Sequence, residues 1–189
     1  MPSTLHTNIN TAVTTFGQLR ALESEVQAAA ALVRDALLAG RKLLACGNGG
    51  SAADAAHLTT EFVCRFTTDR RPYPALCLNA HGGDLTAIGN DYDFQDVFAR
   101  QVRAFGHTGD VLLTFTTSGC SANVIRALHA ASAVGVKSVA LLGRGGGDCR
   151  GLADVELIVP GTLSARIQEA HKLLLHTICE IVENDLPRD

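Results

Sequence analysis

The sequence predicts an α/β fold in which helices cover both faces of a parallel sheet. Short apolar runs alternate with longer amphipathic segments along the chain, and small polar residues follow several of the apolar runs directly. Buried strands separated by helices are typical of parallel sheets, because each connecting helix packs back onto one face. With 189 residues, the chain has the size of one domain with its own core. We therefore predict a single domain spanning residues 1–189.

The first forty residues predict one long amphipathic helix. Apolar side chains recur there at steps of three and four, at Phe16, Leu19, Leu22, Val26, Ala29, Val33 and Leu37. This spacing places them on one face of a helix, and Gly40 is a natural stop. The domain is thus expected to divide into a helical segment, 1–40, and an α/β core, 41–189.

The core is predicted to contain five strands joined by helices. The apolar runs expected to form strands are residues 42–46, 74–78, 110–115, 137–142 and 155–159. The segments expected to be helical are residues 50–66, 85–88, 93–105, 121–134 and 164–184. Ligands bind at the carboxyl ends of the strands in such sheets. The glycine-rich and hydroxyl-rich turns of this chain follow the first and third strands.

Composition argues against nucleic-acid and membrane partners. The net charge is −3, no basic block is present, and the chain has no tryptophan, whereas nucleic-acid binding needs clustered Lys and Arg. The longest apolar candidate, residues 26–38, contains charged side chains and is too short for a membrane span. Residues 1–10 lack the pattern of a secretory signal. Six scattered cysteines without a C-x-x-C pair favour reduced thiols and a cytoplasmic protein.

The turn after the third strand has the composition of a phosphate site. Residues 116–121 read Thr-Thr-Ser-Gly-Cys-Ser, and a helix is predicted to begin directly after them. A helix N-terminus offers free N–H groups and partial positive charge, so it binds phosphate without a lysine. An ordinary serine N-cap is the simpler alternative, but four hydroxyls in six residues exceed what a cap requires.

The turn after the first strand nearly matches a dinucleotide fingerprint. Residues 47–52 read Gly-Asn-Gly-Gly-Ser-Ala, close to G-x-G-x-x-G/A. That fingerprint also needs an acid at the end of the second strand, where this chain has Asn79. No G-x-x-x-x-G-K-[ST] motif is present either. We therefore expect a small phosphorylated metabolite and no nucleotide cofactor, with a dinucleotide-dependent oxidoreductase as a rival hypothesis.

Taken together, the motifs resemble the SIS (sugar isomerase) domain family, and more narrowly its phosphoheptose isomerases. The motifs that carry the resemblance are Cys46-Gly47-Asn48-Gly49-Gly50-Ser51, His57 with Glu61, Gly89-Asn90-Asp91, Thr117-Ser118-Gly119, and Arg166-Ile167-Gln168-Glu169 with His176. They extend over nearly the whole chain. The resemblance implies a three-layer sandwich with a five-stranded, flavodoxin-like parallel sheet.

The same resemblance implies an activity, a substrate and an assembly. The activity is ketose–aldose isomerisation through an enediol, converting sedoheptulose 7-phosphate to D-glycero-D-manno-heptose 7-phosphate for nucleotide-activated heptose synthesis. It implies a homotetramer with shared active sites, in which the helix at 1–40 packs between subunits. Phosphate would be held by Ser51, Thr116, Ser118 and Ser121. The sugar pocket would be lined by Asn48, Gly49, Gly50, Asn90, Asp91, Thr117 and Gln168, with Arg65 reaching in from a neighbouring subunit.

Isomerisation needs a base for the C–H proton and a group that stabilises the enediolate oxygen. The resemblance assigns these roles to Glu61 and His176, and Glu61 lies on a largely apolar helix. His57 and Glu61 are four residues apart and share a helix face. Gln168 and His176 are eight residues apart and lie on approximately the same face of their helix. Two such helices could hold a metal ion. The resemblance makes His57, Glu61, Gln168 and His176 the ligands of one zinc ion per subunit, although glutamine is an unusual zinc ligand.

Some positions differ from the family pattern. Thr116 replaces a serine, Cys120 stands where Asn or Lys is more usual and is expected to be exposed, and residues 79–84 form a divergent, shorter loop. His129 and His171 are expected to be solvated helix histidines without a role. A non-catalytic SIS module that binds a sugar phosphate or a protein is the main alternative function. The presence of both Glu61 and His176 favours the enzyme.

Overall fold

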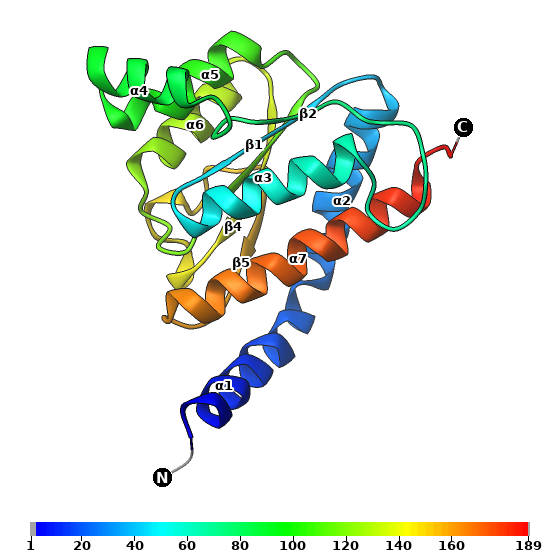
Figure 1. The fold of residues 1–189 in the computed structure, drawn as a ribbon, viewed down its shortest axis with the longest axis vertical. Coiled ribbons are helices and arrows are strands. Elements are labelled where there is room, and N and C mark those ends of the chain that lie inside the picture. Colours follow the sequence, from blue (N-terminus) through cyan, green and yellow to red (C-terminus); the bar gives the residue numbers. More distant parts are fainter. Residues whose placement is uncertain (1–2, 189) are drawn as a thin grey trace.

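The computed structural model describes residues 3–188 and has a five-stranded parallel sheet at its centre (Figure 1). The strands are β1 (Leu43–Gly47), β2 (Ala75–Cys77), β3 (Val111–Thr116), β4 (Lys137–Leu142) and β5 (Val155–Ile158). Their order is β2-β1-β3-β4-β5, with every neighbouring pair parallel. This confirms the predicted flavodoxin-like sheet. Residues 1, 2 and 189 of the predicted domain lie outside the described part.

Helices cover both faces of the sheet, which confirms the three-layer sandwich. One face is covered by α2 (Glu23–Leu38), α3 (Gly50–Val63) and α7 (Ser164–Asp185). The other is covered by α4 (Gly82–Asp91), α5 (Val97–Phe105) and α6 (Ala122–Ala133). Successive strand residues point to opposite faces, so Leu113 packs beneath the first layer and Leu112 beneath the second. Both leucines are fully buried.

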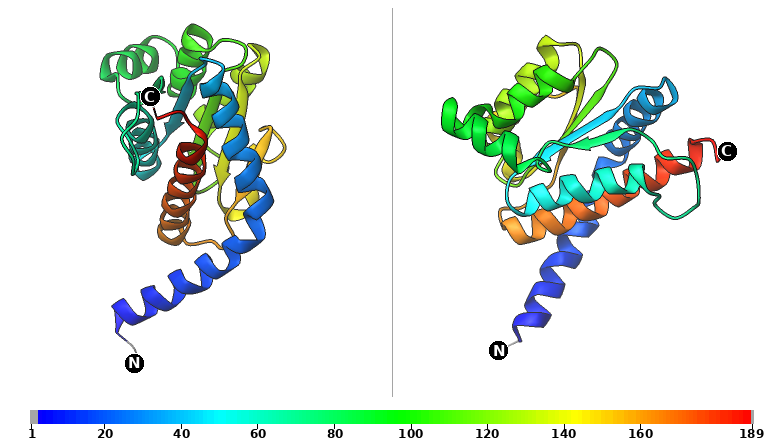
Figure 2. Two further views of the ribbon diagram at one scale, coloured as in Figure 1. Left: turned by 90° about the vertical axis from the view of Figure 1, so that its right-hand side faces the viewer. Right: turned by 45° about the horizontal axis from the view of Figure 1, so that its top comes forward.

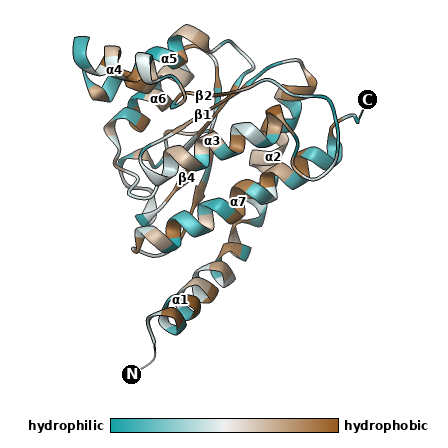
Figure 3. Ribbon diagram, viewed as in Figure 1, coloured by the Kyte–Doolittle hydropathy of each residue, from teal (hydrophilic) through white to brown (hydrophobic). Residues whose placement is uncertain are grey.

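The predicted helix over residues 1–40 is divided in the structure. It consists of α1 (Thr4–Gln18), a 3₁₀ turn (Leu19–Leu22) and α2, and α1 projects away from the sandwich (Figure 2). Burial begins only at Leu19. The apolar side chains of α1 are exposed in the single chain (Figure 3), namely Leu5, Ile9, Val13 and Phe16. The predicted apolar stripe therefore packs on this chain's own core only from Leu19 onward, through the 3₁₀ turn and α2.

Several element boundaries differ from the sequence predictions. α3 ends at Val63, three residues early, because the segment that follows it is tied to α7. The predicted helix 93–105 is a 3₁₀ turn (Phe94–Asp96) followed by α5. A 3₁₀ segment at Arg144–Cys149 was not predicted. Within residues 3–188, no helix combines the length and apolarity needed to cross a membrane.

Candidate active site

The glycine turn at the end of β1 is joined to the start of α6 by a pair of amides. Asn48 donates to Asn123 Oδ1 at 2.8 Å, and Asn123 donates back to Asn48 Oδ1 at 2.9 Å. Gly49, the N-cap of α3, has φ 55°, a conformation that glycine adopts without strain. The reciprocal pair fixes the two turns relative to each other at one edge of the sheet. Asn123 was not among the predicted site residues.

Asn79 has a structural role that disfavours dinucleotide binding. Its side chain donates to the Gly47 carbonyl at 2.9 Å and accepts from the Gly47 N–H at 3.2 Å. Both polar ends of the amide are thereby used on the backbone of β1. Asn79 therefore stands where a dinucleotide-binding protein has its ribose-binding acid, but it hydrogen-bonds the backbone of β1.

The hydroxyl-rich turn after β3, Thr116–Ser121, is an ordered loop, hereafter the hydroxyl loop. The buried Thr116 hydroxyl lies 3.3 Å from Ser118 Oγ and 3.1 Å from Ser121 Oγ, and it accepts from the Gly119 N–H at 3.2 Å. Ser118 Oγ accepts from the Cys120 N–H at 3.1 Å. Ser121 is the N-cap of α6 but makes no side-chain cap bond, so its hydroxyl and the helix's first N–H groups remain available to an anion.

Gly119 allows the backbone of the hydroxyl loop to pack directly against the backbone of Gly146 and Gly147. It has φ 70°, and a Cβ there would lie 2.8 Å from the Gly147 nitrogen and nearer still to the Gly146 carbonyl. The Cys149 N–H donates to the Gly119 carbonyl at 2.8 Å. The glycine-rich segment Arg144–Cys149 therefore packs against the hydroxyl loop and hydrogen-bonds to it. Cys120, as expected, is exposed.

Two histidines and a glutamate meet between α3 and α7. His57 Nε2 lies 3.0 Å from Glu61 Oε1 and 2.9 Å from His176 Nε2. The Phe66 ring lies 5.6 Å from the His176 ring and covers it on one side. Burial, followed by the neighbouring His57 and Lys172, lowers the pKa of His176 from its ordinary value. The spacing aligned His57 with Glu61 on α3, and His176 meets them from α7, as the resemblance implied, but without Gln168. Burial favours the neutral form of the His176 imidazole.

Gln168 lies apart from this cluster. Its amide packs on Gly50, so closely that a Cβ on Gly50 would lie 2.6 Å from Gln168 Cδ. At about 1.5 Å per residue, His57 lies about 10 Å along α3 from Gly50. Gln168 therefore borders the glycine turn, whereas His57, Glu61 and His176 lie further along the same two helices.

A groove beside Gln168 contains an ion pair that the sequence analysis missed. The groove has a volume of about 350 Å³ and is lined by Asp54, Ala165, Gln168, Glu169 and Lys172. Lys172 Nζ lies 2.8 Å from Asp54 Oδ1, and the Asp54 side chain is 2% exposed. The sequence signal for this ion pair was Asp54 itself, which lies among four alanines one turn before His57. A lone charge on an apolar helix face is costly unless it is paired.

Three predicted pocket residues lie outside these groups in the single chain. Arg65 is exposed and donates to the Thr67 carbonyl at 3.2 Å. Asn90 and Asp91, also exposed, hydrogen-bond each other at 2.8 Å at the end of α4, a helix at the outer edge of the molecule (Figures 1 and 2). None of the hydrogen bonds or ion pairs found among residues 3–188 connects these three to the hydroxyl loop or the histidine cluster.

Two further predicted site residues, Ser51 and Thr117, pack near the glycine turn and the hydroxyl loop, and the two other helix histidines differ from each other in burial. Ser51 is buried on the first turn of α3 and lies over Gly47. The Thr117 hydroxyl donates to Ser164 Oγ at 3.5 Å, which connects the hydroxyl loop to the start of α7. His129 is exposed as expected. The expectation for His171 was wrong: it is fully buried against Phe115, and burial lowers its pKa to about 4.

The donor atoms suit zinc in kind. One imidazole nitrogen, His176 Nε2, and one carboxylate oxygen, Glu61 Oε1, lie within 3.0 Å of His57 Nε2, and zinc prefers imidazole and carboxylate ligands. As the side chains stand, however, residues 3–188 contain no group of three or more His, Cys, Asp or Glu arranged to hold a metal ion. Coordination would require the His57 and His176 nitrogens to separate around the ion and the Gln168 amide to turn toward them.

Known proteins are similar to this chain in sequence and in fold. The SIS domain family matches residues 9–143. A phosphoheptose isomerase of Geobacter sp. (strain M21) is 48% identical over 165 residues, which cover 87% of this chain and 86% of that protein. The chain belongs to the phosphoheptose isomerase family. Its fold matches the phosphoheptose isomerase structures from Neisseria gonorrhoeae (TM-score 0.90, 40% identity, 95% of this chain and 97% of that one) and Francisella tularensis (TM-score 0.92, 35%, 95% and 96%).

Proposed function

We propose that this chain isomerises sedoheptulose 7-phosphate to D-glycero-D-manno-heptose 7-phosphate, as a step toward nucleotide-activated heptose. Membership of the phosphoheptose isomerase family supports the reaction and the substrate. The observation that carries the proposal is the cluster in which Glu61 and His176 both approach His57 Nε2, at 3.0 Å and 2.9 Å. A carboxylate beside imidazoles provides the acid and base groups that proton transfer between adjacent carbons requires.

The phosphate would bind at the hydroxyl loop, held by the hydroxyls of Ser51, Thr116, Ser118 and Ser121, with the α6 N-terminus as the positive end. The path of the sugar along α3 would be lined by Asn48, Gly49, Gly50, Thr117 and Gln168. The distance of about 10 Å from Gly50 to His57 is on the scale of an open seven-carbon sugar phosphate. The reacting carbons at the other end of the substrate would then reach the histidine cluster.

The proton transfers can be assigned to the two acid–base side chains. Glu61 takes the proton from C1 of the ketose, which leaves an enediolate with its charge on the C2 oxygen. The neutral His176 imidazole carries the hydroxyl proton from the C1 oxygen to the C2 oxygen, and Glu61 returns its proton to C2, which gives the aldose and restores both groups. A positioned acid or base of this kind contributes about 10²–10⁴-fold to the rate.

We further infer one zinc ion per subunit held by His57, Glu61, Gln168 and His176. A bound zinc would polarise the substrate's oxygens as a Lewis acid. The facing imidazole nitrogens support this inference, since a neutral imidazole is a metal ligand and the His176 pKa is lowered. Metal analysis of the purified protein, with His57→Ala as a control, tests it: about one zinc per wild-type chain is expected, and absence of metal from both proteins would contradict it.

A homotetramer with shared active sites is also proposed. The exposed apolar residues of α1 suit a subunit interface, and Arg65, exposed in the single chain, would reach a neighbour's pocket. Light scattering during gel filtration should give four times the chain mass of 19.9 kDa, and a monomer would contradict this. The scattered cysteines are consistent with the cytoplasmic location that we propose.

The function is tested by purified wild-type protein and Glu61→Gln with sedoheptulose 7-phosphate. The substitution keeps the size of the side chain and removes its basicity, so turnover should fall about 10²–10⁴-fold while substrate still raises the melting temperature. A non-catalytic module would be stabilised by the sugar phosphate equally in both forms and turn it over in neither. That second result would refute the isomerase assignment.

A further inference from the structure

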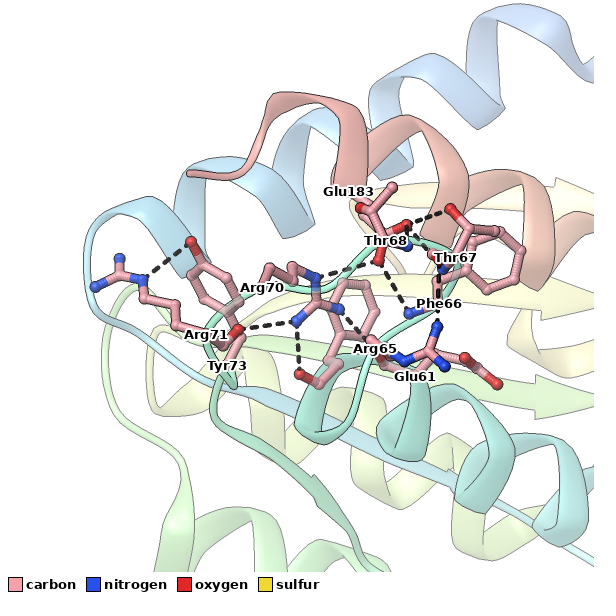
Figure 4. A network of polar contacts seen from close by, with 10 residues as sticks. Glu61, Arg65, Phe66, Thr67, Thr68, Arg70, Arg71, Tyr73 and Glu183 are labelled. Carbon is pink, nitrogen blue, oxygen red and sulfur yellow. Dashed lines mark hydrogen bonds and ion pairs between the residues drawn. The ribbon is translucent and has the colours of Figure 1, made fainter. Parts of the chain in front are cut away.

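A buried carboxylate on α7 holds the segment that follows α3. Glu183 is 4% exposed, and its oxygens accept from the backbone N–H groups of Phe66, Thr67 and Thr68 at 2.9, 2.9 and 3.0 Å. The Thr67 hydroxyl donates to the same carboxylate at 2.6 Å. Four donors on one carboxylate fix this irregular segment against α7 (Figure 4).

A buried arginine connects that carboxylate to the end of α3. Arg70 Nε lies 3.3 Å from Glu183 Oε1. Its other nitrogens donate to the Glu61 carbonyl at 2.7 Å and the Phe62 carbonyl at 3.1 Å. The last carbonyls of a helix lack partners within the helix and carry partial negative charge, so a guanidinium there is favourable. Arg70 thus caps the turn of α3 that contains Glu61.

The network binds the backbone beside one proposed acid–base group directly and borders the other through the Phe66 ring. Arg70 binds the backbone of Glu61, and Glu183 binds the backbone of Phe66, whose ring lies 5.6 Å from the His176 ring. The segment also includes Arg65, which donates to the Thr67 carbonyl. Contacts from Glu183 and Arg70 therefore fix the end of α3 and the segment that follows it against α7 (Figure 4).

We propose that Glu183 and Arg70 are positioning residues for the isomerisation: they fix the last turn of α3 and residues 65–68 against α7, so that Glu61 faces His176. This inference rests on the proposed function. Displacement of a reacting group by about 1 Å can cost about 10²-fold in rate. Loss of the network should therefore lower kcat, with a smaller effect on the KM for sedoheptulose 7-phosphate, because the hydroxyl loop is on other elements.

The test compares Glu183→Gln, Thr67→Val and the control Glu180→Gln, which makes the same chemical change at an exposed position of α7. We expect kcat to fall about 10- to 100-fold in Glu183→Gln, with KM changed less than about threefold. Thr67→Val, which removes one hydroxyl donor and keeps the side-chain shape, should show a smaller loss in the same direction. Glu180→Gln should match wild type.

Hydrogen exchange measured by mass spectrometry provides a readout independent of activity. Peptides covering residues 61–68 should exchange at least tenfold faster in Glu183→Gln, while those from the sheet remain protected. Unchanged exchange, or faster exchange with wild-type kcat, would overturn the positioning role. A wild-type protein without turnover would instead refute the proposed function, and the exchange result would still decide whether Glu183 fixes the segment. If Glu183→Gln does not fold, Thr67→Val carries both measurements.

Discussion

Substitution of Gly50 by alanine should separate activity from stability. A Cβ at this position would lie 2.6 Å from Gln168 Cδ, whereas carbon atoms normally pack about 3.5–4.0 Å apart. The Gln168 amide would therefore have to move by about 1 Å or more. Gly50 opens α3 and does not have a positive φ, so the backbone accepts alanine there.

The expected magnitudes follow from those two facts. A Gly-to-Ala change at a compatible position stabilises a protein by about 0.4–1 kcal/mol, so the melting temperature should hold or rise slightly. Displacement of Gln168 by about 1 Å should lower kcat/KM about 10²-fold, equivalent to about 2.7 kcal/mol of transition-state stabilisation. Opposite signs for stability and activity are the distinctive result.

The assay measures kcat/KM for sedoheptulose 7-phosphate and the melting temperature of each variant. Gly82→Ala is the control, since Gly82 opens α4 and a Cβ there would meet no atom within 4 Å. Gln168→Ala and the double variant complete a cycle in which the two losses should not add, because both act on one amide. Wild-type kcat/KM in Gly50→Ala would refute the placement of Gln168 in the site.

Three other predictions concern binding, pH and the core. The double substitution Ser118→Ala with Ser121→Ala should raise KM at least tenfold with a smaller change in kcat, because hydrogen bonds to a charged phosphate contribute about 1.5–3 kcal/mol each; steady-state kinetics showing an unchanged KM would place the phosphate elsewhere. The Glu183 pKa is lowered from 4.5 to about 2, since bonds from Thr67, Thr68 and Phe66 outweigh the opposing effect of burial. Its stabilisation should be complete above about pH 4.5 and fade as the pH falls toward 2, so urea midpoints of Glu183→Gln should vary less with pH in that range; parallel curves would contradict it. Leu113→Ala, at a fully buried sheet position, should lower the free energy of unfolding by about 2–5 kcal/mol, and a loss below about 1 kcal/mol would mean that the core is not packed as described.

The strand and helix pattern could be predicted because it depends on local periodicity. Apolar runs and i, i+4 spacings located all five strands and aligned His57 with Glu61. The hydroxyl loop was recognisable for the same reason, since its donors are contiguous in sequence. Features that depend on short stretches of sequence could therefore be predicted without the structure.

Contacts between distant segments could not be predicted in this way. The Asn48–Asn123 amide pair joins residues 75 apart, and Glu183 binds Phe66 across 117 positions. Nothing in the local pattern marks Glu183 as buried rather than solvated, and so the early end of α3 was missed. The break between α1 and α2 was also missed, because the apolar stripe continues through it although its side chains are exposed on α1 and buried on α2.

A crystal structure of Glu61→Gln with sedoheptulose 7-phosphate would test the proposed site at both of its ends. We predict the phosphate within hydrogen-bonding distance of Ser118 and Ser121, and C1 and C2 beside residue 61 and His176. A phosphate bound away from the hydroxyl loop, or reacting carbons remote from those two side chains, would contradict the proposed mechanism.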